Sequence, residues 1–180
     1  MSGTVHIVLF RGVGGATQLP TAPLRAALAE AGFDRVATYI NSGNAVLVSR
    51  WDAARTRQVL AKMCAERFDF RKPIFIPTLD EWRRLVGANL FAVGEGAGNL
   101  LHAAWFDETP TAANIARLKE LAVGGDGFEV AGNAAYLSTP NGFSRSRLAE
   151  RFDKWIGTPN SARNWNTILK LRELAEKASA

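Results

Sequence analysis

Short runs of apolar residues recur along the chain and predict an alternation of strands and helices. Val5–Phe10 is apolar on both of its faces, so we expect a central strand that is covered from both sides. A helix should follow, with Thr21 as its cap and Gly32 as its stop. Val36–Ile40 and Ala45–Ser49 indicate two strands joined by a tight hairpin, because Asn and Gly between them favour positive φ angles.

A second helix and a short strand complete this part of the pattern. Asp52 should cap the helix, whose apolar stripe includes Leu60 and Cys64. Pro73–Pro77 indicates a short strand, and its prolines predict an edge position in the sheet. The order strand, helix, strand, strand, helix, strand is that of the ferredoxin-like fold.

The second half of the chain repeats the first. The segment HIVLF at His6–Phe10 matches HAAWF at His102–Phe106, and SGNAVLVS at Ser42–Ser49 matches AGNAAYLS at Ala131–Ser138. Such self-similarity indicates duplication of one unit. We therefore predict an α+β protein of two tandem ferredoxin-like (α-β plait) subdomains with an extra C-terminal helix. The expected boundaries are 1–78 for the first subdomain, 79–99 for a short helix and Gly-rich linker, and 100–180 for the second.

The second copy is expected to end differently from the first. Ser144 should cap its second helix, and the sixth element should be a helix that starts within Arg163–Thr167 rather than a strand. Trp165 begins an apolar stripe on that last helix, which favours a core position for its indole. In the linker, Thr78 and Glu81 have the spacing of a capping box.

Composition and charge narrow the class of protein. A hydrophobic fraction of 47% with 22% charged residues is ordinary for a globular protein, and no apolar run approaches the roughly 18–20 residues of a membrane span. The first residues lack the basic region of a secretory signal, and the single cysteine, Cys64, fits a reducing compartment. We expect a cytoplasmic protein without a membrane segment.

The net charge of +5 is unevenly distributed. Residues 1–90 hold 12 Lys and Arg against 7 Asp and Glu, and residues 144–172 hold 7 against 2. Basic tracts of this kind suit nucleic acid or a phosphorylated small molecule, and the alternative is a solvated helix face.

Four polar segments are candidates for binding an anion. Arg11–Gly15 follows a strand, where a Gly-rich turn can present N–H groups to a phosphate or can simply be a tight turn. The NSGN hairpin can bind a ligand or hydrogen-bond its own backbone. Two helix starts carry arginines, which we expect to share one anion site, with Arg163 as bidentate donor and Asn166 orienting the ligand. In that last case, the alternative is structural: Asn164 or Asn166 caps the helix, and Arg163 bonds a nearby carboxylate or carbonyl. The arginines of the earlier helix start can also simply be hydrated. The candidate residues are Arg11, Gly12, Asn41, Ser42, Asn44, Arg145, Ser146, Arg163, Asn164, Asn166, Thr167 and Lys170.

The sequence offers no recognisable catalytic or metal-binding set. His6 and His102 occupy equivalent strand positions, but two histidines and one cysteine without a carboxylate cluster do not form a ligand set. No nucleophile–base pair, paired carboxylates or nucleotide fingerprint is present. We expect neither a metal nor a cofactor.

Several of these segments together resemble a bacterial family known as domain of unknown function number 1697. They are LFRGVGG, LPTAPLRAALAEAGF, TYINSGNAVL, STPNGFSRSRL and RNWNTILKL. The resemblance covers nearly the whole chain and implies a pair of ferredoxin-like subdomains, with no established activity. The first loop departs from the usual R-G-I-N-V-G-G, because it is two residues shorter, lacks the Asn and has Gln18 where Lys is common.

Three functions are compatible with this pattern. The first is binding of an anion, either nucleic acid or a nucleotide-like ligand, through the basic helix starts. The second is an enzyme that acts on a small anionic metabolite in a cleft between the subdomains. The third is a structural or protein-interaction module. We expect the first, and a monomer.

Overall fold

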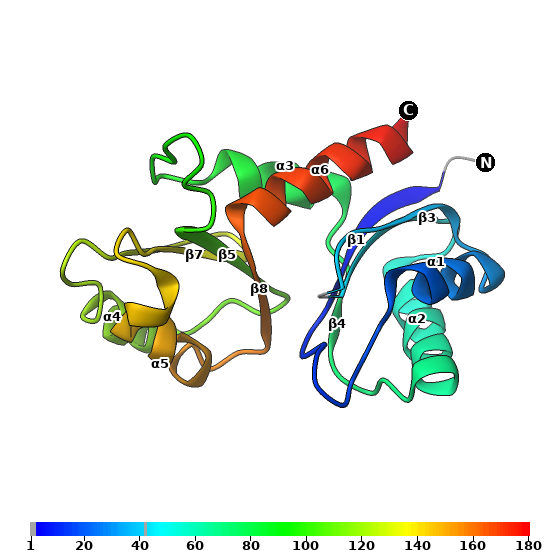
Figure 1. Ribbon diagram of the computed structural model, residues 1–180, viewed down its shortest axis with the longest axis horizontal. Coiled ribbons are helices and arrows are strands. Elements are labelled where there is room, and N and C mark those ends of the chain that lie inside the picture. Colours follow the sequence, from blue (N-terminus) through cyan, green and yellow to red (C-terminus); the bar gives the residue numbers. More distant parts are fainter. Residues whose placement is uncertain (1–2, 42) are drawn as a thin grey trace. The chain divides into compact units, whose positions relative to one another are not determined.

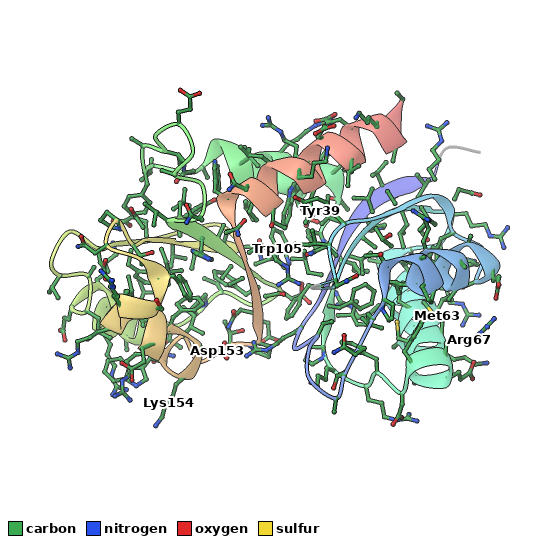
Figure 2. The ribbon with its side chains drawn as sticks, in the orientation of Figure 1. Tyr39, Met63, Arg67, Trp105, Asp153 and Lys154 are labelled. Atoms are coloured by element: carbon green, nitrogen blue, oxygen red, sulfur yellow. The ribbon has the colours of Figure 1, made fainter. Side chains whose placement is uncertain are left out.

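The computed structural model describes residues 3–41 and 43–180, which form two compact units (Figure 1). The first unit comprises Met1–Arg83 together with Lys170–Ala180, and the second comprises Arg84–Leu169. Within the described residues each unit contains one four-stranded antiparallel sheet with helices against it. The chain is thus a mixed α and β protein of two sheet-containing units, as its pattern predicts.

The sheet of the first unit has the strand order β2-β3-β1-β4. Its elements in chain order are β1 (Thr4–Phe10), α1 (Thr21–Glu30), β2 (Asp34–Thr38), β3 (Asn44–Ser49), α2 (Ala53–Phe68) and β4 (Ile74–Phe75). Helix α3 (Leu79–Gly87) begins in this unit, and α6 (Trp165–Ser179) ends in it. The predictions that β1 is central and that the proline-flanked β4 is an edge strand are confirmed.

Different helices lie against the two faces of this sheet. Val8 and Phe10 of β1 pack with Leu47 of β3 against α1 and α2, in one buried apolar cluster. Because side chains alternate along a strand, Val5, Ile7 and Leu9 point to the opposite face. On that side the end of α6 is tied to the sheet, since Arg35 Nη1 of β2 donates a hydrogen bond of 2.9 Å to the Ala178 carbonyl.

The second unit repeats this arrangement with the order β6-β7-β5-β8. Its elements are β5 (Leu101–Phe106), α4 (Ala112–Lys119), β6 (Gly127–Ala131), β7 (Ala134–Ser138), the 3₁₀ helix η1 (Phe143–Arg145), α5 (Arg147–Trp155) and β8 (Asn160–Asn164). Ala104 and Phe106 of β5 lie in a buried cluster with Leu118 of α4 and Phe152 of α5. One face of this sheet is therefore covered by α4 and α5.

The end of the second copy differs from the prediction. Asn160–Asn164 forms strand β8, which pairs with β5 from Phe106↔Asn160 to His102↔Asn164. The sixth element of the copy is therefore a strand, the fourth of its sheet, and α6 begins only at Trp165. The expected boundaries also differ from the units observed, because Lys170–Ala180 belongs to the first unit and residues 84–99 to the second. The reason is that the apolar stripe of α6 continues through Leu171, Ala175 and Ala178, which are all buried.

Helix caps were predicted with mixed success. Asp52 caps α2 by accepting from the Arg55 amide at 2.7 Å, and the Thr78 amide binds Glu81 Oε2 at 2.7 Å, as in a capping box. Thr21 is the first helical residue of α1 rather than its cap, which is Pro20. Ser144 lies within η1, and the cap of α5 is Ser146. The prediction failed there because two serines, Ser144 and Ser146, lie close together before the helix and either could have been its cap.

Candidate functional site

Three loops meet at one end of the first sheet, which we call the loop end. They are the glycine loop Arg11–Gly15, the hairpin Tyr39–Asn44 and the segment Asp69–Pro73. The Arg11 amide donates to the Pro73 carbonyl at 3.1 Å, and the Phe10 amide donates to the Gly43 carbonyl at 3.0 Å. These bonds fix the three loops to the ends of β1, β3 and β4.

The glycine loop has a conformation that requires glycine. Gly12, Gly14 and Gly15 have φ angles of 72°, 138° and 56°, which residues with a Cβ atom rarely adopt. A Cβ atom added at Gly14 or Gly15 would meet nothing within 4 Å, so the tip of the loop is open to solvent. At Gly43 such an atom would lie 2.5 Å from Val13 Cγ2, which shows that the hairpin packs directly on this loop.

Basic side chains gather at the loop end. Lys72 Nζ donates a hydrogen bond of 2.7 Å to the Gly12 carbonyl, and this exposed ammonium group therefore lies directly over the glycine loop. Arg11 follows β1 and is half-buried, whereas Arg71 is exposed and pairs with Asp69 at 3.2 Å. Lys72 was not among the residues predicted for the site, although the Arg71–Lys72 pair before a short strand was a signal for it.

Helix α1 begins at the same end, because it follows the glycine loop. Its cap, Pro20, makes no side-chain hydrogen bond to the first turn, and no acidic residue lies in that turn. The first amides of a helix lack intrahelical partners and form the positive end of the helix dipole. The start of α1 thus adds positive potential to that of the basic side chains.

The whole excess of positive charge lies on the first unit. It holds 14 Lys and Arg against 9 Asp and Glu, whereas the second unit holds 8 of each. The tract 144–172 is basic only as a stretch of sequence, because the fold divides it between the units and places acidic side chains beside part of it. Lys170 Nζ, for example, lies 2.8 Å from Glu173 Oε2.

The predicted hairpin residues have unequal surroundings. Asn44 is buried and donates from Nδ2 to the Tyr39 carbonyl at 3.2 Å, so it holds the hairpin together. Asn41 is exposed at the tip, and Ser42 lies outside the described residues. Ile40 has a φ of 47° although its side chain is β-branched, and such backbone strain costs on the order of 1–3 kcal/mol.

The structure does not bring the two predicted helix starts of the second unit together. Phe143 of η1 stacks on His102, with ring centroids 4.0 Å apart, and His102 shares the face of Ala104 that α4 and α5 cover. Arg163 pairs in register with Ala103 and so points to the other face of the sheet. Arg145 and Arg163 therefore lie on opposite sides of one sheet.

The remaining residues around the start of α6 have structural contacts. Asn164 is the cap of α6, since its Oδ1 accepts from the Thr167 amide at 3.0 Å. Thr167 is itself buried, and the side chain of Asn166 lies against Gly98. Ser146 caps α5 by accepting from the Ala149 amide at 3.0 Å, and its hydroxyl lies 2.6 Å from Asp126 Oδ2.

Arg163 is held inside its own strand. Its Nη1 donates to Ser161 Oγ at 3.0 Å and to the Ala162 carbonyl at 2.7 Å. Removal from water lowers the pKa of Arg163 to about 10, which still leaves the guanidinium charged at neutral pH.

Each of the two histidine rings has a buried nitrogen atom without a hydrogen-bond partner within residues 3–41 and 43–180. His6 Nδ1 lies 3.0 Å from the Ile76 carbonyl, while His6 Nε2 and His102 Nδ1 are buried without a partner among the described residues. Burial lowers the pKa of both side chains, that of His102 to about 4. No group of three His, Cys, Asp or Glu that could hold a metal occurs in the described part of the chain.

Comparison with known proteins places the chain in a family. Residues 4–136 match the family model described as "Protein of unknown function (DUF1697)". The chain belongs to this family. It is similar in structure to a conserved bacterial protein of Streptococcus pneumoniae, with a TM-score of 0.76 and 20% sequence identity over 97% of this chain and 99% of the other. No curated protein matches the sequence. Among the described helices, none combines the length and the apolar character needed to cross a membrane.

Proposed function

We propose that the protein binds a phosphate-bearing anion, a nucleotide-like ligand or nucleic acid, at the loop end of the first unit. The observation that carries this proposal is the Lys72–Gly12 hydrogen bond, which fixes an exposed ammonium group over an open glycine loop. Arg11 and the uncapped start of α1 lie at the same end of the sheet. Glycine-rich turns before a helix start, with a basic side chain above them, suit phosphate oxygens.

We further infer that the two units are ferredoxin-like repeats that arose by duplication. The strand orders β2-β3-β1-β4 and β6-β7-β5-β8 support this, because equivalent elements take equivalent places in each sheet. The copies have diverged at the loop end, where Asp107 in the second replaces Arg11 of the first. This divergence is consistent with one anion site rather than two. The buried free thiol of Cys64 is consistent with a cytoplasmic protein.

The proposal is tested by melting the protein in increasing concentrations of inorganic phosphate, ADP and a short single-stranded oligonucleotide. A ligand that binds only the folded state raises the melting temperature with its concentration. Lys72→Met removes the ammonium group and keeps the stem, so it should flatten the rise. Lys62→Met is the matched control, since Lys62 is exposed on α2 of the same unit and pairs only weakly with Glu66, at 3.9 Å.

The outcomes of this melting experiment distinguish a loop-end site from general binding to a basic surface. Loss of the rise in Lys72→Met but not in Lys62→Met supports the loop-end site. An equal reduction in both variants would show general screening of a basic surface and would overturn it. A rise with ADP and phosphate alone indicates a nucleotide-like ligand, whereas a rise with the oligonucleotide alone, steeply weakened by salt, indicates nucleic acid.

A further inference from the structure

A groove lies at the opposite end of the first sheet from the loop end. It is lined by the start of β1, the start of β2, the end of β3 and the end of α6, and its volume is about 630 Å³. This is within the range of roughly 300–1,000 Å³ that small-molecule sites occupy. The lining residues are Gly3, Val5, Asp34, Arg35, Val48, Arg50, Ala178 and Ser179.

The groove combines an apolar floor with a basic rim. Val5, Val48 and Ala178 supply the apolar part. Arg35 and Arg50 are both exposed and are opposed by one carboxylate, that of Asp34. Gly3 packs closely on β3 beside the groove, because a Cβ atom there would lie 2.6 Å from Val48 Cγ1.

Arg35 occupies a backbone position that favours glycine. Asp34 pairs with Val48 and Ala37 with Val46, so Arg35 and Val36 together face a single residue of β3, which is a β-bulge. The φ angle of Arg35 is 48°, as at the first position of a bulge that normally carries glycine. An arginine at this position is strained, and bulges commonly re-aim a side chain beside a binding site.

One contact gives Arg35 a structural role as well. Its Nη1 donates to the Ala178 carbonyl in the last turn of α6. A guanidinium has five N–H donors in a planar fork, so this bond leaves donors for a second acceptor. Arg50 supplies a second guanidinium, which lies 4.8 Å from the centre of the Trp51 ring.

From this arrangement we infer that the groove is a second ligand site, for a small organic carboxylate with an apolar body. The arginines are complementary to the carboxylate, which guanidinium groups bind in a bidentate manner, and the apolar floor takes the body of the ligand. The site is separate from the loop end, so it does not rest on the anion-binding function proposed above.

The probe for this site is phenylacetate, titrated into the full chain by calorimetry or by amide chemical shifts. Acetate is the control without an apolar body, and phenylethylamine is the control with the opposite charge. We expect phenylacetate to bind and both controls to bind at least about tenfold more weakly. Equal binding of acetate, or no binding of phenylacetate, would overturn the inference.

Two variants test the residues. Arg50→Gln should weaken phenylacetate binding about tenfold, the loss of one charge-assisted contact. Arg35→Gly should weaken it similarly, while its melting temperature without ligand changes little, because relief of the strain at φ 48° offsets the lost hydrogen bond to Ala178. If Arg35→Gly binds phenylacetate like the wild type but melts earlier, Arg35 serves only as a cap for α6 and the inference is wrong. Lys72→Met is the reference variant and should leave phenylacetate binding unchanged.

Discussion

Arg83 on α3 binds Glu176 on α6 through two parallel hydrogen bonds, from Nε to Oε1 at 2.9 Å and from Nη2 to Oε2 at 2.5 Å. The two residues are 93 positions apart in sequence and belong to the same unit. Together with the Arg35–Ala178 bond, this fork holds the last turns of α6 in the first unit. These bonds add to the buried apolar stripe of α6, which keeps the end of the chain in the first unit.

This fork predicts a dependence of stability on pH and salt. The hydrogen bonds from Arg83 lower the pKa of Glu176, so the contribution is present above the pKa of the unfolded state and is lost as the pH falls through the lower folded value. Arg83→Gln should therefore reduce stability slightly at pH 7 and less at pH 2.5, and high salt should reduce the difference because both groups are exposed. Denaturant melts at both pH values measure this. A larger effect of the substitution at pH 2.5 would contradict it.

Trp165 gives the prediction with the largest effect. Its side chain is only 6% exposed, and its amide donates to the Gly98 carbonyl at 2.9 Å. Trp165→Ala should lower the free energy of unfolding by about 3–5 kcal/mol, as other large-to-small core substitutions do. Leu169→Ala on the same helix is the control, since Leu169 is 37% exposed and its loss should cost much less. Equal effects in a denaturant melt would place the indole outside the core.

His102 predicts a loss of stability in mild acid. Burial lowers its pKa from 6.5 to about 4, so the folded state resists protonation that the unfolded state accepts. Stability should be complete above pH 6.5 and should fall by about 1–2 kcal/mol as the pH drops towards 4, after discounting for partial exposure. His102→Gln should flatten this part of the curve. His6 has a pKa shifted in the same direction, so an unchanged curve would assign the loss to His6 instead.

Apolar periodicity predicted the two sheets and the position of β1, because burial of alternate side chains leaves a direct mark on the sequence. It missed β8 because Asn160–Asn164 is a polar edge strand, in which Asn164 also serves as the cap of the following helix. The repeat itself contained the missing information, since the first copy ends in a strand. For the candidate site, the glycine loop was visible in the sequence. Its contact with Lys72, 60 residues later, depends on the tertiary fold and could not be seen in the sequence.

Arg163 provides the test that separates the two candidate anion sites. Its guanidinium is bonded to Ser161 and Ala162 within β8, on the sheet face opposite to η1 and Arg145. Arg163→Ala should therefore lower the free energy of unfolding by about 1–3 kcal/mol, and by the same amount at every phosphate concentration. Lys72→Met should show the reverse, with a small loss in plain buffer that grows with phosphate as the wild type gains stability and the variant does not. Arg145→Ala, which removes an exposed arginine of the second unit, should show neither effect. If the phosphate response instead disappears in Arg163→Ala and persists in Lys72→Met, the anion site lies at the start of α6 and not at the loop end.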